Sequence, residues 1–337
     1  MKNYKYIGLF LLSLGVISCD VNNELDEIPE EVVQTVELNT NGLDFSSYVS
    51  VGASFTAGFT DNALFIAAQE NSFPNILAGK FGTEFNQPLM NDNIGGLLFA
   101  GNVIQGPRLF FNGAGPAPLA GTPTTEVTSS VSGNLNNFGV PGAKSFHFVA
   151  PGYGNVQGVP VGLANPYYAR MASSPSATVL GDAMAQSPTF FTLSEIGGND
   201  VLGYATSGGS GVDQTGNLDP STYGGSDITD PNVFAQVFST MVSTLTSGGA
   251  KGVVANVPYI TNLAHFTTVP HNPIPLDAAT AGAVNAAYAP YNGGIQQAFG
   301  ALVQLGLMTQ EMAAAEIAKR TISFSAGQNA VVIIDED

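Results

Sequence analysis

The stretch Tyr48-Val-Ser-Val-Gly52-Ala-Ser54-Phe-Thr-Ala-Gly58 decides which fold the chain is expected to adopt. Its first residues have the β-branched and aromatic side chains that are typical of a short buried strand. The strand is followed at once by a loop of small residues, and Asp61 and Asn62 then precede an apolar run, which predicts a helix start. Ser54 is therefore expected on a strand-to-helix turn at the carboxyl edge of an open α/β sheet, the edge where such sheets bind ligands.

Composition is consistent with one large domain. The 337 residues are 44% hydrophobic, and a single alternation of strands and helices runs through the chain, so we expect one domain over residues 41–337. Nine Lys and Arg residues stand against 26 Asp and Glu residues, which gives a formal net charge of −17. This charge opposes nucleic acid and anionic membrane faces as partners.

The N-terminus predicts export. A basic segment, Met1-Lys-Asn-Tyr-Lys5, precedes an apolar run that is too short to span a bilayer, so residues 1–18 are predicted to be a secretory signal peptide. The run ends in Val16-Ile-Ser-Cys19, which resembles the lipobox of bacterial lipoproteins and contains the only cysteine of the chain. The resemblance implies cleavage before Cys19, lipidation of Cys19 and a lipid anchor at the bacterial cell envelope. A soluble secreted protein with a chance cysteine is the alternative.

Residues 19–40 are expected to be a tether. Seven acidic residues and no Lys or Arg occur between Asp20 and Glu37, and such a segment cannot bury a core. It would hold the domain away from the membrane.

Two later segments carry candidate functional residues. Gly139-Val-Pro-Gly142 predicts a turn in which the N–H of Gly142 can point outward, although an ordinary turn glycine is the alternative. A strand predicted over Thr189–Ile196 ends in Gly197-Gly-Asn199-Asp200. The side-chain amide of Asn199 is a neutral hydrogen-bond donor at the end of a strand. Asp200 is expected to cap the following turn.

Together these three segments resemble blocks I, II and III of the SGNH/GDSL hydrolases, with Ala53 where that family usually has Asp. The turn is not the Gly-x-Ser-x-Gly elbow of α/β-hydrolases, because Thr56 stands two residues after Ser54. The resemblance implies a three-layer α/β/α sandwich with a central, mostly parallel sheet, similar to flavodoxin. It also implies that Ser54 is the nucleophile of an esterase or lipase that forms an acyl-enzyme, and that Gly142 and Asn199 belong to its oxyanion hole.

The remaining segments predict further helices, strands and insertions. Residues 86–134 are expected to be a long insertion, either a lid or wall over a site or a surface loop, and residues 207–230 a second insertion. The periodicity predicts helices over 63–81 with an interruption near Pro74, over 165–171, over 230–245, over 277–307 with a break at 291–294, and over 309–320; it predicts buried strands over 251–257 and 329–335.

The fourth family block, an Asp-x-x-His pair after the last strand, is not found, so the domain over 41–337 is expected to be incomplete at its C-terminus. Three explanations stay open: a fragment whose parent continues, a non-catalytic relative, or another histidine as the base. His265 and His271 lie in the loop after the predicted strand 251–257, at the functional edge of the sheet, whereas His147 is expected to be structural.

No metal-ligand spacing and no phosphate-binding loop occur, so the sequence implies no cofactor. The expected function is hydrolysis of lipid or acylated-carbohydrate esters at the envelope, and the apolar insertion loops favour acyl chains. The alternative from another class is a surface lipoprotein that binds glycan or lipid without turnover. A third possibility is a structural envelope protein built from a degenerate hydrolase.

Overall fold

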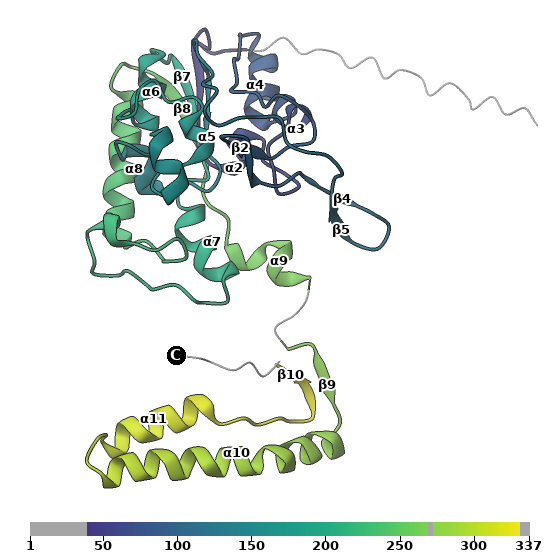
Figure 1. Cartoon of the computed structure of the whole chain (residues 1–337). Coiled ribbons are helices and arrows are strands. Elements are labelled where there is room, and N and C mark those ends of the chain that lie inside the picture. The colour runs from purple at the N-terminus through teal and green to yellow at the C-terminus, as the bar shows by residue number, and fades with distance from the viewer. Residues whose placement is uncertain (1–38, 269–271, 331–337) are drawn as a thin grey trace, which may run out of the picture. The chain divides into compact units, whose positions relative to one another are not determined.

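A computed structural model describes residues 39–268 and 272–330 of the chain (Figure 1). The chain divides into two units, Met1–Asn41 and Gly42–Asp337. The predictions for the signal peptide, for Cys19, for most of the tether, for His271 and for the apolar run 331–335 lie outside the described residues. No helix in the described part of the chain is long and apolar enough to cross a membrane.

A four-stranded parallel sheet organises the unit that begins at Gly42, as the strand pattern predicted. Gly52 lies opposite Gly139 on one side and opposite Ser194 on the other. Because all the pairings are parallel, the carboxyl ends of these strands meet at one edge. The strands follow the order β6 (Asn137–Gly139), β1 (Tyr48–Gly52), β7 (Phe190–Ser194) and β8 (Lys251–Val254).

Helices pack on both faces of this sheet, which makes the fold α/β as expected. Val49 and Phe191 belong to a buried cluster with residues of α6 (Val179–Ala185) and α8 (Pro231–Thr246). Tyr48 and Phe190 precede them by one residue and therefore face the other way. They pack with Phe81 of α4 (Phe73–Phe81), with Phe85 after that helix and with Phe45 before β1.

Shorter elements complete this part of the chain. The insertion 86–134 contains two hairpins, β2–β3 and β4–β5, rather than one irregular loop. The strands of these hairpins are Leu97–Phe99, Asn102–Gln105, Leu109–Phe111 and Pro116–Pro118. The short α-helices are α2 (Ser54–Ala57), α3 (Ile66–Glu70), α5 (Pro166–Ala169), α7 (Gly198–Thr206) and α9 (Ala264–Thr267), and the 3₁₀ helices are η1 (Ser145–Val149), η2 (Val156–Val161), η3 (Pro220–Thr222) and η4 (Ile260–Asn262).

Two predictions for this region need correction. Asp61 and Asn62 do not cap a helix, because both have positive φ angles, +52° and +62°, and form a turn before α3. The predicted interruption of the following helix is confirmed, since α3 ends at Glu70 and α4 begins at Phe73. Strand β8 pairs in parallel with β7 as predicted, but it is exposed rather than buried, and Val253 is 56% exposed. Within the described residues β6 and β8 are the two edge strands of this sheet.

The segment 272–330 consists of two helices, α10 (Ala278–Gln304) and α11 (Gln310–Arg320), and two short paired strands, β9 (Ile274–Leu276) and β10 (Gly327–Asn329). The predicted break at 291–294 is wrong, because α10 runs through it. Asn292 accepts from the N–H of Ile322 at 3.0 Å and donates to its carbonyl at 2.8 Å, and Asn285 does the same with Phe324. Both asparagines precede Gly293 and Gly294, and their bonds connect this part of α10 to the chain that follows α11.

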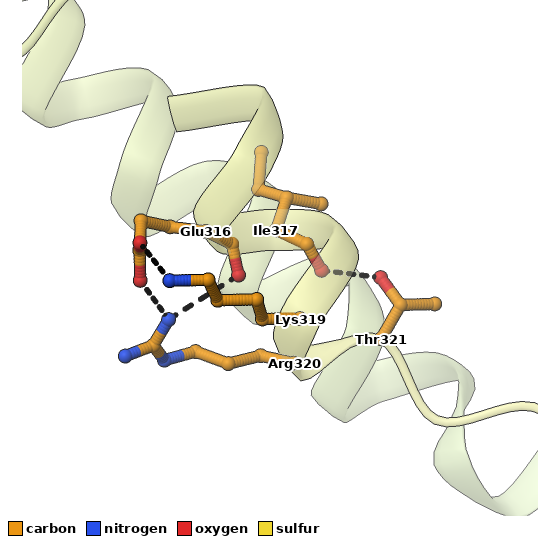
Figure 2. A network of polar contacts seen from close by, with 5 residues as sticks. All are labelled: Glu316, Ile317, Lys319, Arg320 and Thr321. Carbon is orange, nitrogen blue, oxygen red and sulfur yellow. Dashed lines mark hydrogen bonds and ion pairs between the residues drawn. The ribbon is translucent and has the colours of Figure 1, made fainter. Parts of the chain in front are cut away.

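Helix α11 begins as predicted, because the Thr309 hydroxyl accepts from the N–H of Met312. At its C-terminal end Glu316 pairs with Lys319 at 3.0 Å and also with Arg320 (Figure 2). The Thr321 hydroxyl donates to the carbonyl of Ile317 at 2.7 Å and so occupies one of the last carbonyls of the helix.

Candidate active site

Three predicted residues follow three neighbouring strands at the same sheet edge. Ser54 comes two residues after the end of β1, Gly142 three residues after β6, and Asn199 five residues after β7. The first residue of the second loop is tied to β1, since the N–H of Val140 donates to the carbonyl of Gly52 at 2.8 Å. The parallel register therefore brings the three loops to one edge of the sheet.

Small residues allow the turn with Ser54 to pack closely against its neighbours. A Cβ atom on Gly139 would lie 2.2 Å from the backbone nitrogen of Ala57, and one on Gly52 would lie 2.1 Å from Oγ1 of Thr56. Both distances are shorter than a Cβ atom tolerates, so Gly139 lets helix α2 lie against β6, and Gly52 leaves room for the Thr56 side chain beside β1. The glycines therefore fix where Ser54 stands.

The backbone amides at this edge include donors that the protein does not use. Within the described residues, the N–H groups of Ser54 and Gly142 donate to no protein acceptor. Gly142 is exposed and has a φ of +78°, a conformation that glycine adopts without strain. The turn is held from both sides, because Asn165 donates to the carbonyl of Pro141 at 2.8 Å and Asn199 to that of Ala143 at 2.9 Å. Asn199 donates one of its two side-chain amide hydrogens in this bond, and the other stays available as a donor.

Asp200 connects the second and third loops. Its buried carboxylate accepts from the N–H of Ser145 at 2.8 Å and from the Ser145 hydroxyl at 2.6 Å. The prediction that Asp200 caps its own following turn is therefore wrong. Helix α7 begins at Gly198, so Asp200 lies in its first turn and binds η1 instead.

Lys144 and His147 fix the chain next to the Gly142 turn. The Lys144 ammonium donates to the carbonyl of Asp227 at 2.7 Å and to that of Gly224 at 3.2 Å, so it holds the insertion 207–230. Nδ1 of His147 accepts from the N–H of Lys144 at 3.0 Å, and its ring stacks on Tyr153 with centroids 4.1 Å apart. Burial, together with the nearby Lys144 charge, lowers the pKa of His147 to about 4. His147 is thus a neutral structural residue, as expected from the sequence.

Glu195 is a residue at this edge that the sequence did not single out. Its Oε2 accepts from the N–H of Phe55 at 2.8 Å, and its Oε1 accepts from the N–H and the hydroxyl of Thr56, each at 2.8 Å. Burial raises the pKa of Glu195, although these hydrogen bonds oppose that effect. The one available signal was an acidic residue at the end of the otherwise neutral run Thr189–Ile196.

An open groove of about 650 Å³ lies near the turn with Gly142, but Ser54, Gly142 and Asn199 are not among its lining residues. It lies between η1 and the insertion 207–230, and Lys144 and Asn165, which flank or bind the turn, belong to its wall. Aromatic side chains line it, among them Phe146, His147, Tyr153 and Tyr223. This size and lining are typical of pockets for small organic ligands.

None of the described residues is hydrogen-bonded to the Ser54 hydroxyl as a general base would be. His265 lies in α9, is exposed, and meets Phe266 edge-on. Nor do the residues that the structure describes include three His, Cys, Asp or Glu side chains close enough to hold a metal ion.

Comparison of the chain with protein-family models, with curated proteins and with solved structures found no match. The relation to SGNH hydrolases therefore stays a prediction that rests on three short motifs. The observed geometry comprises a parallel α/β sheet and the meeting of Ser54, Gly142 and Asn199 at one of its edges.

Proposed function

We propose that the chain is a serine ester hydrolase of the SGNH type, with a three-layer α/β/α sandwich, that acts through an acyl-enzyme. The observation that carries the proposal is the grouping of Ser54 with unused hydrogen-bond donors at one sheet edge. An ester carbonyl that reacts with a serine becomes a tetrahedral oxyanion, and such an anion needs donors that point at it.

Each residue has a separate role in the proposed reaction. The Ser54 oxygen forms a bond to the ester carbonyl carbon and loses its proton to a base. The N–H groups of Ser54 and Gly142 and the free amide hydrogen of Asn199 stabilise the oxyanion. The alcohol leaves with a proton, and water then cleaves the acyl-serine bond and restores the Ser54 hydroxyl. The base is a prediction from the resemblance alone.

The proposed substrate class comes from the resemblance, and the groove near the Gly142 turn is compatible with it. Aromatic rings bind both acyl chains and sugar rings through apolar contact, so lipid esters and acylated carbohydrates are both compatible with it. The proposed location is the bacterial envelope, where a lipid on Cys19 would keep the domain close to such substrates. Incorporation of a labelled fatty acid into the wild type, and its absence from Cys19→Ala, would test the anchor.

The alternative function is binding of glycan or lipid without turnover. It is favoured by one observation, the lack of a hydrogen-bonded histidine at the Ser54 hydroxyl among the described residues. A serine without a base is a weak nucleophile, so such a protein would bind esters and not cleave them.

A fluorophosphonate probe separates the two functions, because it reacts covalently only with an activated serine. We expect labelling of the full-length protein and none of Ser54→Ala. Ser247→Ala is the matched control, because Ser247 is an exposed serine that directly follows α8 and precedes β8, at the opposite edge of the sheet. Equal labelling of wild type and Ser54→Ala, or no labelling of either, would refute the enzyme and leave the binding protein.

A further inference from the structure

We infer that Glu195 is a positioning residue for the nucleophile turn: its carboxylate binds the second and third amides of α2 and leaves the amide of Ser54 to the substrate. The inference rests on the proposed function, because it assigns Glu195 a role toward Ser54. It adds a residue from a different strand end, 140 residues away in sequence, to the machinery of the site.

The hydrogen bonds span the first turn of α2. One carboxylate oxygen takes the amide of Phe55 and the other takes the amide and hydroxyl of Thr56, and each of the three distances is 2.8 Å. Two rigid bonds to consecutive amides fix the direction of the turn as well as its position. Ser54, which directly precedes these two residues, is held by the same contact.

The same contact determines which amide stays free. The N–H of Ala57 donates to the carbonyl of Ala53 at 3.1 Å, and Glu195 takes those of Phe55 and Thr56. Of the four N–H groups of α2, the Ser54 N–H is therefore the one that the described protein groups do not use. A carboxylate that took this amide as well would repel the developing oxyanion.

The backbone of Glu195 is held in an uncommon conformation. Its φ is +63°, which costs on the order of 1 kcal/mol or more in a residue with a Cβ atom. Its carbonyl accepts from the N–H of Gly198 at 3.0 Å, so the strained residue also starts the turn that leads to Asn199. A residue keeps a strained backbone conformation only where the contacts around it hold it there, and such residues are concentrated at functional sites.

A proton on one oxygen of Glu195 makes that oxygen a donor and a poor acceptor, so the three bonds are strongest when Glu195 is ionised. The groups that face it are the amides of Phe55 and Thr56 and the hydroxyls of Thr56 and Ser194, and burial outweighs them in raising its pKa. No charged group acts on it among the described residues. The turn is therefore expected to loosen at a higher pH than an ordinary glutamate would allow.

The test compares Glu195→Gln with Glu126→Gln in the full-length protein. Glu126 is a matched control, because its carboxylate also accepts from two consecutive amides, those of Ala100 and Gly101, but in the β2–β3 hairpin. With p-nitrophenyl butyrate as the probe, we expect Glu195→Gln to lower kcat about 100-fold with little change in KM, the cost of a small misplacement of reacting groups. Glu126→Gln should keep the wild-type kcat.

Two further readouts distinguish positioning from a merely structural role. Hydrogen exchange at the Phe55 and Thr56 amides should speed up in Glu195→Gln. In the wild type, protonation of Glu195 should lower kcat at acidic pH, and this part of the pH profile should be absent from Glu195→Gln. Thr56→Val, which loses one of the three bonds, should lower kcat several-fold and serves if Glu195→Gln does not fold.

The outcomes separate this inference from the proposed function. A wild type that neither hydrolyses the ester nor shows Ser54-dependent labelling overturns both. An active wild type whose kcat is unchanged by Glu195→Gln, or equally reduced by Glu126→Gln, overturns the role of Glu195 and leaves the hydrolase standing.

Discussion

The parallel sheet and the segment 272–330 are held together by different kinds of interaction. Large apolar side chains on the sheet are almost fully buried; Phe191, for example, is 2% exposed. In the segment 272–330, Ala281 and Ala313 are the buried apolar residues, and paired asparagine bonds connect the helix to the chain that follows it. The sheet therefore depends on apolar burial, which a sequence displays, whereas the segment 272–330 depends on individual polar contacts, which a sequence does not display.

The largest expected effect is the loss of a core ring from the sheet. Phe191→Ala should lower the free energy of unfolding by about 3–5 kcal/mol, because it leaves a cavity under Gly252 and against α8. Phe299→Ala in α10 removes the same atoms from a half-buried ring that lies beneath Arg320. It should cost about 1–2 kcal/mol. Urea denaturation measures both values, and equal values would remove the proposed contrast between the two regions.

The next effect is a pH dependence within the sheet region. The pKa of His147 is about 4 in the folded chain and 6.5 in its ordinary state, so the fold favours the neutral ring. The contribution of neutral His147 to the free energy of unfolding is fully present above pH 6.5. It is lost as the pH falls toward 4, because the unfolded chain binds the proton at a higher pH than the folded chain does. The loss should reach up to about 3 kcal/mol.

A variant isolates this contribution of His147. His147→Asn keeps an acceptor for the N–H of Lys144 and does not titrate, so its stability should fall less between pH 6.5 and pH 4. Denaturation curves at several pH values provide the measurement. A wild type and a variant with the same slope would show that His147 already accepts a proton in the folded protein.

A smaller effect is expected where two loops of the candidate site meet. Asp200→Asn replaces a carboxylate that accepts twice from Ser145 by an amide with one acceptor. It should cost about 1.5–3 kcal/mol, the range for bonds to a charged group. Asp213→Asn, an exposed position that binds its own neighbour Thr215, is the control and should change stability little. A similar cost for both variants would mean that Asp200 does not join the loops.

In the segment 272–330 the corresponding test is an asparagine. Asn285→Ala removes both hydrogen bonds to the backbone of Phe324 and should cost about 1–2 kcal/mol. Gln296→Ala, an exposed change in the same helix, is the control. Amide exchange along α10 should rise in Asn285→Ala. If it stays unchanged, the asparagine bonds do not hold the helix to the chain after Arg320.

The sequence predicts the sheet well because its signals are local. The runs around Tyr48–Gly52 and Phe190–Ser194 carry their strand character in themselves, and glycines mark where each strand gives way to a turn. Parallel pairing then brings Ser54, Gly142 and Asn199 to one edge without further information. Confirmed parts of the prediction are therefore those in which neighbouring residues decide the structure.

Prediction from the sequence fails where contacts between residues far apart in the chain determine the structure. The partner of Asp200 lies 55 residues away and that of Glu195 lies 140 residues away, so neither bond has a local pattern. The sequence predicts a break of α10 at its glycines, but the helix continues. Its two asparagine contacts come from residues 30 and 39 positions further on, so no local pattern indicates them. The exposure of β8 is likewise not revealed by the apolar run 251–257.

The smallest effect is expected from the charged group of Glu316. Its carboxylate binds Lys319 and Arg320 at the surface of α11, and solvent and salt screen such pairs, so Glu316→Gln should change the free energy of unfolding little (Figure 2). The pKa of Glu316 is lowered by its hydrogen bonds to Lys319 and Arg320, so the contribution is present above the ordinary pKa of a glutamate and is lost as the pH falls through the lowered value. Denaturation measures the free energies of unfolding of the variant and the wild type, and any difference at low salt should disappear at high salt. A cost as large as that of Asn285→Ala would instead show that charge pairs, and not the asparagine bonds, stabilise this segment.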